Sequence, residues 1–135
     1  MNCWISYYGI KNGGYNGFGE YPYQARSPAT NSLKIYKDLS DVLSELCYIY
    51  DELIEKGEDN LGEILYLDHF FFCNTSDLVV IKFQDLIKSF NFCKTFSCPP
   101  YSSLDLTPAN LVDDFLEIEA QTNKIAKIEA KKQKR

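Results

Sequence analysis

One stretch, Asp38 to Gly57, constrains the fold of this chain more than any other, because its apolar residues recur at steps of three and four positions. That spacing places them on one wide face of an amphipathic helix. The residues of this apolar stripe are Leu39, Val42, Leu43, Leu46, Cys47, Ile49, Tyr50, Leu53 and Ile54. Asp38 or Ser40 is suited to cap the first turn, and Gly57 is suited to end the helix. We therefore expect a central helix that buries this stripe.

The opposite face of this predicted helix is acidic, with Lys56 as the one base of the segment. Its residues are Asp41, Glu45, Tyr48, Asp51, Glu52 and Glu55. Like charges four positions apart, as in Asp51 and Glu55, cost a helix about 0.2–0.5 kcal/mol for each pair. A helix folds by burying an apolar stripe, and it does not need five carboxylates on one solvent face. We interpret these six residues as a candidate surface for binding a partner, with Tyr48 as its anchor. A face kept acidic for solubility is the alternative.

Charge is distributed in blocks along the chain, whose net charge is −5. Residues 38–63 hold nine acids and one base, residues 105–119 hold five acids and no base, and residues 120–135 hold six bases and one acid. Such blocks are typical of electrostatic partnering, either within a chain or with another molecule. A net negative charge disfavours direct binding to nucleic acid, so the expected partner is a protein with a basic surface. Folding of the basic residues 124–135 against the acids of the same chain is the alternative.

The remaining sequence predicts an α+β fold, in which a small, mostly antiparallel sheet is packed by the central amphipathic helix and a long C-terminal helix. Strands are expected at residues 2–10, 33–36, 64–72 and 78–83, the last two joined as a hairpin by residues 74–77. Helices are expected at residues 38–57, at 85–92 and from Thr107-Pro108 onward, where Leu111, Phe115, Ile118, Thr122 and Ile125 line one face. Residues 1–128 are expected to form a single domain, followed by a basic tail at 129–135 that projects or frays.

Residues 9–31 form a long segment rich in Gly, Tyr and Asn, a composition typical of binding loops. Its glycine spacing matches neither the dinucleotide fingerprint nor the lysine-bearing phosphate loop. An alternative function follows from this segment, namely a small-ligand or nucleotide-binding domain with Arg26 as an anion contact. The candidate ligand-binding residues are Tyr15, Asn16, Tyr21, Tyr23 and Arg26.

The histidine and thiol side chains provide a further candidate site. His69, Cys73, Cys93 and Cys98 have the residue types of a zinc site, but their spacing is not that of a tight zinc knuckle. Cysteine also serves as a small core residue, so we expect no metal and no cofactor. The sequence contains one histidine and no catalytic motif, and we therefore expect a protein that is not an enzyme.

Five cysteines without a recognisable secretory leader favour reduced thiols in the cytoplasm. The most apolar stretch, Ile64 to Cys73, is too short to span a bilayer, so no membrane association is expected. Small size, Asn-, Lys- and Tyr-rich composition and the lack of motifs would suit an inhibitor encoded by a phage or a mobile element. The leading hypothesis is a small acidic interaction module that captures a basic or nucleic-acid-binding surface of another protein. The sequence does not predict an oligomeric state.

Overall fold

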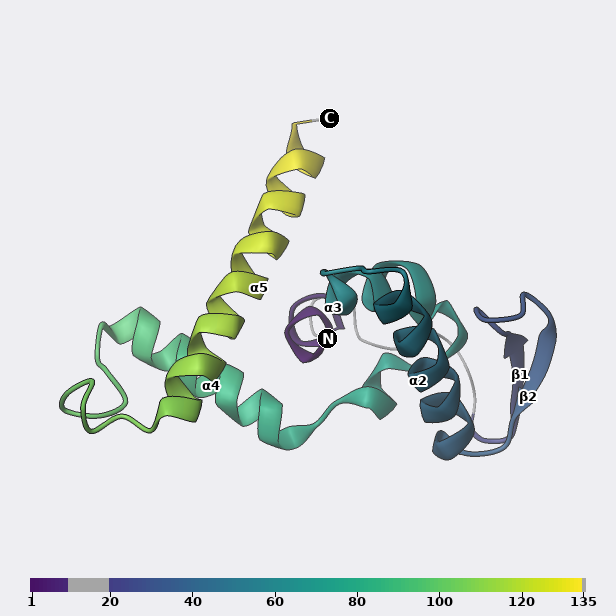
Figure 1. The fold of residues 1–135 in the computed structure, drawn as a ribbon, viewed down its shortest axis with the longest axis horizontal. Coiled ribbons are helices and arrows are strands. Elements are labelled where there is room, and N and C mark those ends of the chain that lie inside the picture. Colours follow the sequence, from purple (N-terminus) through teal and green to yellow (C-terminus); the bar gives the residue numbers. More distant parts are fainter. Residues whose placement is uncertain (10–19, 135) are drawn as a thin grey trace. The chain divides into compact units, whose positions relative to one another are not determined.

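The computed structural model describes residues 1–9 and 20–134, which belong to two compact units, Met1–Val79 and Val80–Arg135 (Figure 1). The first unit holds the helical segments α1 (Asn2–Trp4), η1 (Ile5–Gly9), α2 (Leu39–Glu55), α3 (Leu61–Ile64), η2 (Leu65–His69), η3 (Phe70–Phe72) and η4 (Thr75–Leu78), and the strands β1 (Tyr23–Arg26) and β2 (Leu33–Tyr36). The second unit holds α4 (Ile81–Phe96) and α5 (Ala109–Gln133). The described chain is therefore mostly helical, with one small antiparallel sheet of two strands.

The predicted central helix is confirmed as α2, including both of its ends. At the N-terminus, the Asp38 carboxylate accepts a hydrogen bond from the Asp41 N–H at 3.2 Å. At the C-terminus, the Gly57 N–H bonds to the Ile54 carbonyl at 2.9 Å, and the Glu58 N–H bonds to the Leu53 carbonyl at 3.0 Å. Gly57 has φ +75°, the left-handed conformation that this type of helix end requires.

The two-stranded sheet is a hairpin in which Tyr23 pairs with Tyr36 and Arg26 pairs with Leu33. Its connection is closed by a 2.8 Å bond from the Ser27 N–H to the Ser32 carbonyl. The prediction of a strand at residues 33–36 is confirmed by β2. Its partner β1 lies inside residues 9–31, for which no strand was predicted.

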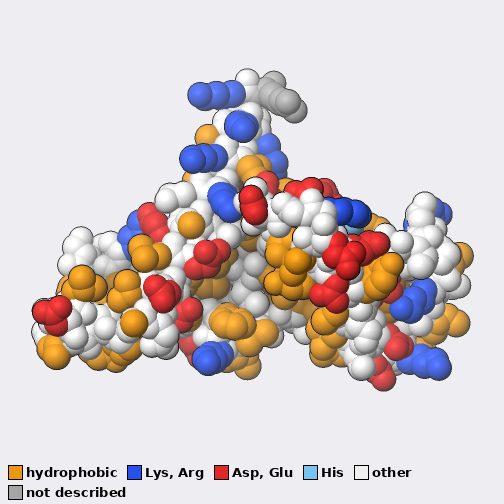
Figure 2. Space-filling view, in the orientation of Figure 1, with side chains coloured by type: hydrophobic (Ala, Val, Ile, Leu, Met, Phe, Trp, Pro, Cys, Tyr) orange, Lys and Arg blue, Asp and Glu red, His pale blue; other side chains and the backbone are white. Residues whose placement is uncertain are grey.

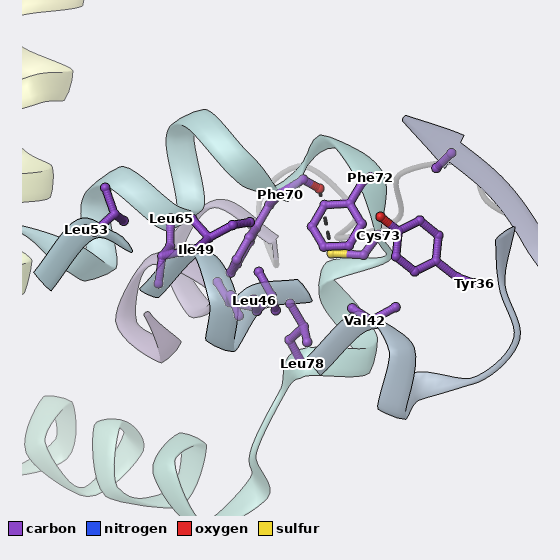
Figure 3. Close-up of a cluster of buried hydrophobic side chains, with 12 residues drawn as sticks. Tyr36, Val42, Leu46, Ile49, Leu53, Leu65, Phe70, Phe72, Cys73 and Leu78 are labelled. Atoms are coloured by element: carbon purple, nitrogen blue, oxygen red, sulfur yellow. Dashed lines mark hydrogen bonds between the residues drawn. The ribbon is translucent and has the colours of Figure 1, made fainter. Parts of the chain in front are cut away.

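The core of the first unit forms around one side of α2, from which Val42, Leu46, Ile49 and Leu53 point into a cluster of buried side chains (Figure 3). The facing residues are Leu65, Phe70, Phe72, Cys73 and Leu78 from the helical segments, and Tyr36 from β2. The rings of Tyr36 and Phe72 lie 5.2 Å apart between their centroids. Burying each large apolar side chain contributes about 1.5–3 kcal/mol, so this cluster holds the hairpin and the helical segments against α2.

The predicted hairpin at residues 64–72 and 78–83 is wrong, because these residues form helical turns and the start of α4. Branched and aromatic residues favour strands only weakly, and packing overrides that preference. The buried residues Phe70, Phe72, Cys73 and Leu78 do not alternate as in a strand with one buried face. Local bonds satisfy the backbone instead, for example from the Asp77 N–H to the Asn74 carbonyl at 3.1 Å.

The strand predicted at residues 2–10 is also wrong over the described residues 2–9, which form α1 and η1. Buried Trp4 and Tyr8 are four positions apart and stack with ring centroids at 6.0 Å. That separation brings two side chains together on a helix, whereas on a strand it would only place them on one side. The aromatic content of this segment favoured a strand, but its spacing fits a helical turn.

In the second unit, α4 begins four residues before the predicted helix at 85–92 and ends four residues after it. Ser97 follows it in the left-handed conformation, and the Cys98 N–H closes its end on the Cys93 carbonyl at 3.0 Å. The helix predicted after Thr107-Pro108 is confirmed as α5. The Thr107 hydroxyl does not cap it, however, and donates instead to the Ser103 carbonyl at 2.8 Å.

Ile118 and Ile125 are the buried residues of α5, and the Phe90 and Phe115 rings meet edge to face at 5.4 Å. The helix continues past residue 128 to Gln133, where fraying was expected. The limits of a single domain at residues 1–128 stay a prediction. None of the helices among residues 1–9 and 20–134 combines the length and the apolar character needed to cross a membrane.

Candidate partner-binding surface

Burial divides α2 into three faces, where the sequence predicted two. The first is the buried face of Val42, Leu46, Ile49 and Leu53. The second, which we name the apolar row, consists of Leu39, Leu43, Cys47, Tyr50 and Ile54, all of which are exposed. The third is acidic. Half of the predicted apolar stripe is therefore left at the surface, and Figure 2 shows hydrophobic side chains and carboxylates grouped together over the part of the first unit that includes α2.

Asp41, at the N-terminal end of the acidic face, stabilises the first turn of α2 through hydrogen bonds. Its carboxylate accepts a hydrogen bond from the Lys37 N–H at 2.8 Å, while its own N–H bonds to Asp38. A carboxylate in the first turn also interacts favourably with the positive end of the helix dipole. Its position is therefore explained by the fold.

Glu45 was expected on the solvent face, and the structure corrects this placement because the side chain is only 6% exposed. Its Oε1 accepts hydrogen bonds from the Ser27 hydroxyl and, at 3.3 Å, from the Ala29 N–H, and its Oε2 lies 2.7 Å from Lys34 Nζ. Burial alone would raise the pKa of the Glu45 carboxyl, but the bonds from Lys34 and Ser27 outweigh it and hold that pKa below its usual range. Glu45 joins the hairpin to α2 and is not accessible to a partner.

The remaining members of the predicted surface are Tyr48, Asp51, Glu52 and Glu55, which we name the acidic end of α2. Tyr48 is 55% exposed, and its hydroxyl donates to Glu52 Oε1 at 3.3 Å. The Glu52 charge raises the pKa of the Tyr48 hydroxyl. Within the described part of the chain, the carboxylates of Asp51, Glu52 and Glu55 form no ion pair.

The position of these carboxylates is unfavourable for the helix itself. They occupy the C-terminal half of α2, whose end carries a partial negative charge, and the last turn of the helix contains no base. A carboxylate there costs about 0.3–1 kcal/mol when it is near the terminus, and the pair Asp51–Glu55 adds its own repulsion. Exposed Glu58 and Asp59 follow directly and extend the negative charge. The fold does not account for this arrangement.

The alternative ligand-binding residues are only partly described, since Tyr15 and Asn16 lie outside the described residues. The Tyr21 hydroxyl donates to Asp77 Oδ2 at 3.1 Å, and burial together with Asp77 raises its pKa to about 12. Tyr23 stacks on the core residue Tyr36, with ring centroids 5.5 Å apart, and the Tyr21 ring lies tilted against it at 5.2 Å. Arg26 lies at the other end of β1, where it donates to Asn31 Oδ1 at 3.2 Å. The tyrosines support the core, and Arg26 does not converge on them.

The weak metal alternative divides between the two units. Cys73 is fully buried, its thiol contacts the Phe70 carbonyl oxygen at 3.9 Å, and burial raises its pKa to about 12. Cys93 and Cys98 lie together at the end of α4, where the Cys98 N–H meets the Cys93 carbonyl. Among the residues that the structure describes, no group of three or more His, Cys, Asp or Glu side chains is placed to hold a metal ion.

The second unit contains an apolar groove of about 590 Å³ that sequence reasoning missed. Its walls come from α4, α5 and their connection, and they include Phe90, Pro99, Leu104, Leu111, Phe115 and Leu116. The ion pair between Lys94 Nζ and Glu119 Oε2, at 2.8 Å, also lines it. The leucines of residues 101–107, which follow two prolines in a loop, were the available signal for an unfilled apolar site.

Comparisons with protein-family models, with curated proteins and with solved structures find no match for this chain. The candidate surface therefore rests on three observations of the molecule itself. The carboxylates of the acidic end have no basic partner in the described residues, they stand at the unfavourable end of their helix, and a row of apolar side chains lies exposed beside them.

Proposed function

We propose that this chain is a small interaction module that captures a basic surface of another protein through the acidic end of α2. The observation that carries the proposal is the set of carboxylates of Asp51, Glu52 and Glu55 near exposed Tyr48, which form no ion pair within the described residues. Lysine or arginine side chains of a partner would relieve both the repulsion within this set and its conflict with the helix dipole. The partner would therefore supply the positive charge that these carboxylates lack within the described residues.

Tyr48 gives this surface an anchor as well as charge. Tyrosine is enriched among the residues that dominate binding energy, because its ring buries a large area at small cost in conformational entropy. The bond from its hydroxyl to Glu52 orders the side chain before binding. Charge on either side of the ring speeds encounter with a basic surface and selects against acidic ones.

A basic surface on a protein is often one that holds nucleic-acid phosphates. An acidic module that occupies such a surface would act as a competitive inhibitor of nucleic-acid binding, and this is the role we propose. The role needs binding alone, so the proposal includes neither catalysis nor a cofactor, and it places the protein in the cytoplasm with its thiols reduced. It would suit a protein encoded by a phage or mobile element.

The test compares two charge reversals that change the net charge equally. One converts Asp51, Glu52 and Glu55 on α2 to lysine, and the control converts exposed Asp113, Asp114 and Glu117 on α5 to lysine. Proteins captured from a cell lysate by the wild type are identified by mass spectrometry, and each is then purified and titrated against all three chains. We expect a partner that binds the wild type and the α5 variant, and that loses most of its affinity for the α2 variant.

Two results would contradict this proposal. If both reversals weaken binding equally, the partner responds to net charge and not to α2. If the α2 reversal leaves every titration unchanged, the acidic end of α2 takes no part in capture. Circular dichroism of the variants shows whether each remains folded, and exposed residues without bonds to the core are expected to tolerate substitution.

A further inference from the structure

The apolar row of α2 is an exposed feature that the capture of charge does not use. Leu43 is 45% exposed, Tyr50 43% and Ile54 49%, although one face of the same helix is buried in the core. Scattered apolar residues at a surface are ordinary, but these are consecutive members of one pattern. Leu39, Leu43, Cys47, Tyr50 and Ile54 follow each other at steps of four, four, three and four residues.

Steps of three and four residues place side chains in one line along a helix. The row runs over sixteen residues, from Leu39 to Ile54, and these fifteen steps correspond to about 22 Å at the standard rise per residue. This is the spacing at which two helices pack side by side, with the apolar side chains of each between those of the other. A line of this kind is complementary to another helix more than to a flat surface or to a small ligand.

Two residues of the acidic end, Asp51 and Glu55, border the row on one side, whereas Tyr48 and Glu52 lie farther around the helix. Asp51 lies one helical turn after Cys47. Glu55 lies one turn after Asp51 and is the next residue after Ile54. On the other side, the row passes into the buried face, where Leu46 and Leu53 pack in the core. A helix lying on the row would therefore meet carboxylates along one edge only. Its own facing edge would have to carry lysine or arginine, because an uncharged or acidic edge would leave the carboxylates unpaired or repelled.

We propose that the apolar row of α2, with Asp51 and Glu55 along its edge, binds one amphipathic helix of the partner, with apolar side chains at helical spacing and basic residues along one edge. This inference rests on the proposed function and specifies the partner's structure. A second copy of α2 fits less well, because it would bring a second set of carboxylates in place of bases. Recognition of a helix by apolar anchors at three- and four-residue steps is a recurring mode of peptide binding.

The test uses two peptides of about 18 residues that consist of leucine and lysine in identical numbers, long enough to cover the row. In one peptide the leucines are spaced for a single helix face, and in the other they are scattered around the helix. Their affinities for the full chain are measured by fluorescence anisotropy. We expect the amphipathic peptide to bind about tenfold more tightly or better, since a tenfold difference corresponds to about 1.4 kcal/mol.

Variants of the protein separate the two contributions. The double substitution Leu43→Ser and Tyr50→Ser should lower affinity for the amphipathic peptide about tenfold and leave the scattered peptide nearly unaffected. Leu116→Ser, a single leucine-to-serine change at an exposed residue of α5, is the control and should change neither affinity. Because these side chains are exposed, the variants are expected to stay folded, and thermal melts verify this.

The outcomes distinguish this inference from the function on which it rests. Equal affinity for both peptides, lost on reversal of Asp51, Glu52 and Glu55, would overturn the helix inference and leave charge capture standing. Binding of neither peptide, or binding unaffected by that reversal, would count against both. Equal losses in the Leu116→Ser control and the row variant would show nonspecific apolar adhesion and overturn the inference. Sedimentation that shows a dimer of the free chain, abolished by the row variant, would assign the row to a second copy instead.

Discussion

Lys34 Nζ lies 2.7 Å from Glu45 Oε2, and this contact fastens the hairpin to α2. The two ends of the contact differ, since Lys34 is 42% exposed and Glu45 is 6% exposed. Lys34 also lies over the Tyr36 ring, with Nζ 5.3 Å from the ring centroid. Glu45 is thus a buried carboxylate with three donors, and its role differs from that of the other acids on the same helix.

Replacing Glu45 with alanine should destabilise the first unit by about 1–3 kcal/mol, because the Ser27 hydroxyl and the Ala29 N–H would lose their acceptor in a buried site. Replacing half-buried Glu52, which bonds only to Tyr48 on the same helix, with alanine should change stability by less than about 0.5 kcal/mol. Urea denaturation followed by circular dichroism measures both. Equal effects of the two substitutions would show that the bonds to Glu45 do not stabilise the fold.

The same carboxyl predicts a dependence of stability on pH. The pKa of Glu45 is lower in the folded chain than in the unfolded chain, so the unfolded chain binds its proton first as the pH falls. Its contribution is fully present above the ordinary carboxyl pKa of about 4.3 and is lost as the pH falls through the lower folded value. Glu45→Gln should therefore flatten the decline in unfolding free energy below about pH 4.5. A wild type and variant that decline in parallel would contradict this assignment.

Glu55→Lys should stabilise α2 and weaken partner binding in the same protein. The new lysine would lie one turn after Asp51, replacing repulsion by an ion pair worth about 0.3–0.5 kcal/mol, and its charge would suit the end of the helix. A rise in melting temperature accompanied by weaker binding of the amphipathic peptide is the expected result. Lower stability of the variant would mean that Glu55 serves the fold after all.

Cys47 and Cys73 should differ sharply in reactivity toward a maleimide. Cys47 is exposed in the apolar row, whereas Cys73 is fully buried and its raised pKa leaves little thiolate. Mass spectrometry of the native chain after brief labelling should find Cys47 modified, and Cys73 modified only after denaturation. Labelled Cys47 should also obstruct the amphipathic peptide. Rapid native labelling of Cys73 would contradict the described core.

Leu46 and Leu43 test the division of the apolar stripe into a buried and an exposed half. Leu46→Ala removes a buried side chain and should cost about 2–5 kcal/mol. Leu43→Ala removes one that is 45% exposed, and its cost should stay below about 1 kcal/mol. Chemical denaturation of the two variants measures both values. Comparable costs would show that the row is covered in solution.

Sequence reasoning succeeded where short-range chemistry decides the structure. Asp38 and Gly57 mark the ends of α2 through bonds to residues within five positions, and Pro108 marks the start of α5 in the same way. It failed at residues 2–9 and 64–83, where the aromatic content indicated strands. In the structure these residues form helical turns, which fit the spacing of their buried side chains. The spacing of Trp4 and Tyr8 was visible in the sequence, but nothing local excluded a strand.

The candidate surface was predictable in part for a related reason. The carboxylates of the acidic end could be placed on one side of a helix from their spacing alone. The burial of Glu45 could not be predicted from spacing. Its partners Ser27, Ala29 and Lys34 lie 18, 16 and 11 residues earlier in the chain, and the hairpin brings them to it. Nor could spacing show which half of the apolar stripe faces the core. Both facts depend on what packs against α2.

The separation of faces on α2 has an evolutionary consequence. The residues of α2 that stabilise the unit point toward the core or toward Lys34 and Ser27. Asp51, Glu55 and the apolar row are exposed and contribute little to the stability of the described chain. Under the proposed function, mutations on the outer sides would therefore alter recognition at small cost in stability. A lineage competing with a changing target could revise its binding specificity one exposed residue at a time while the scaffold stays constant.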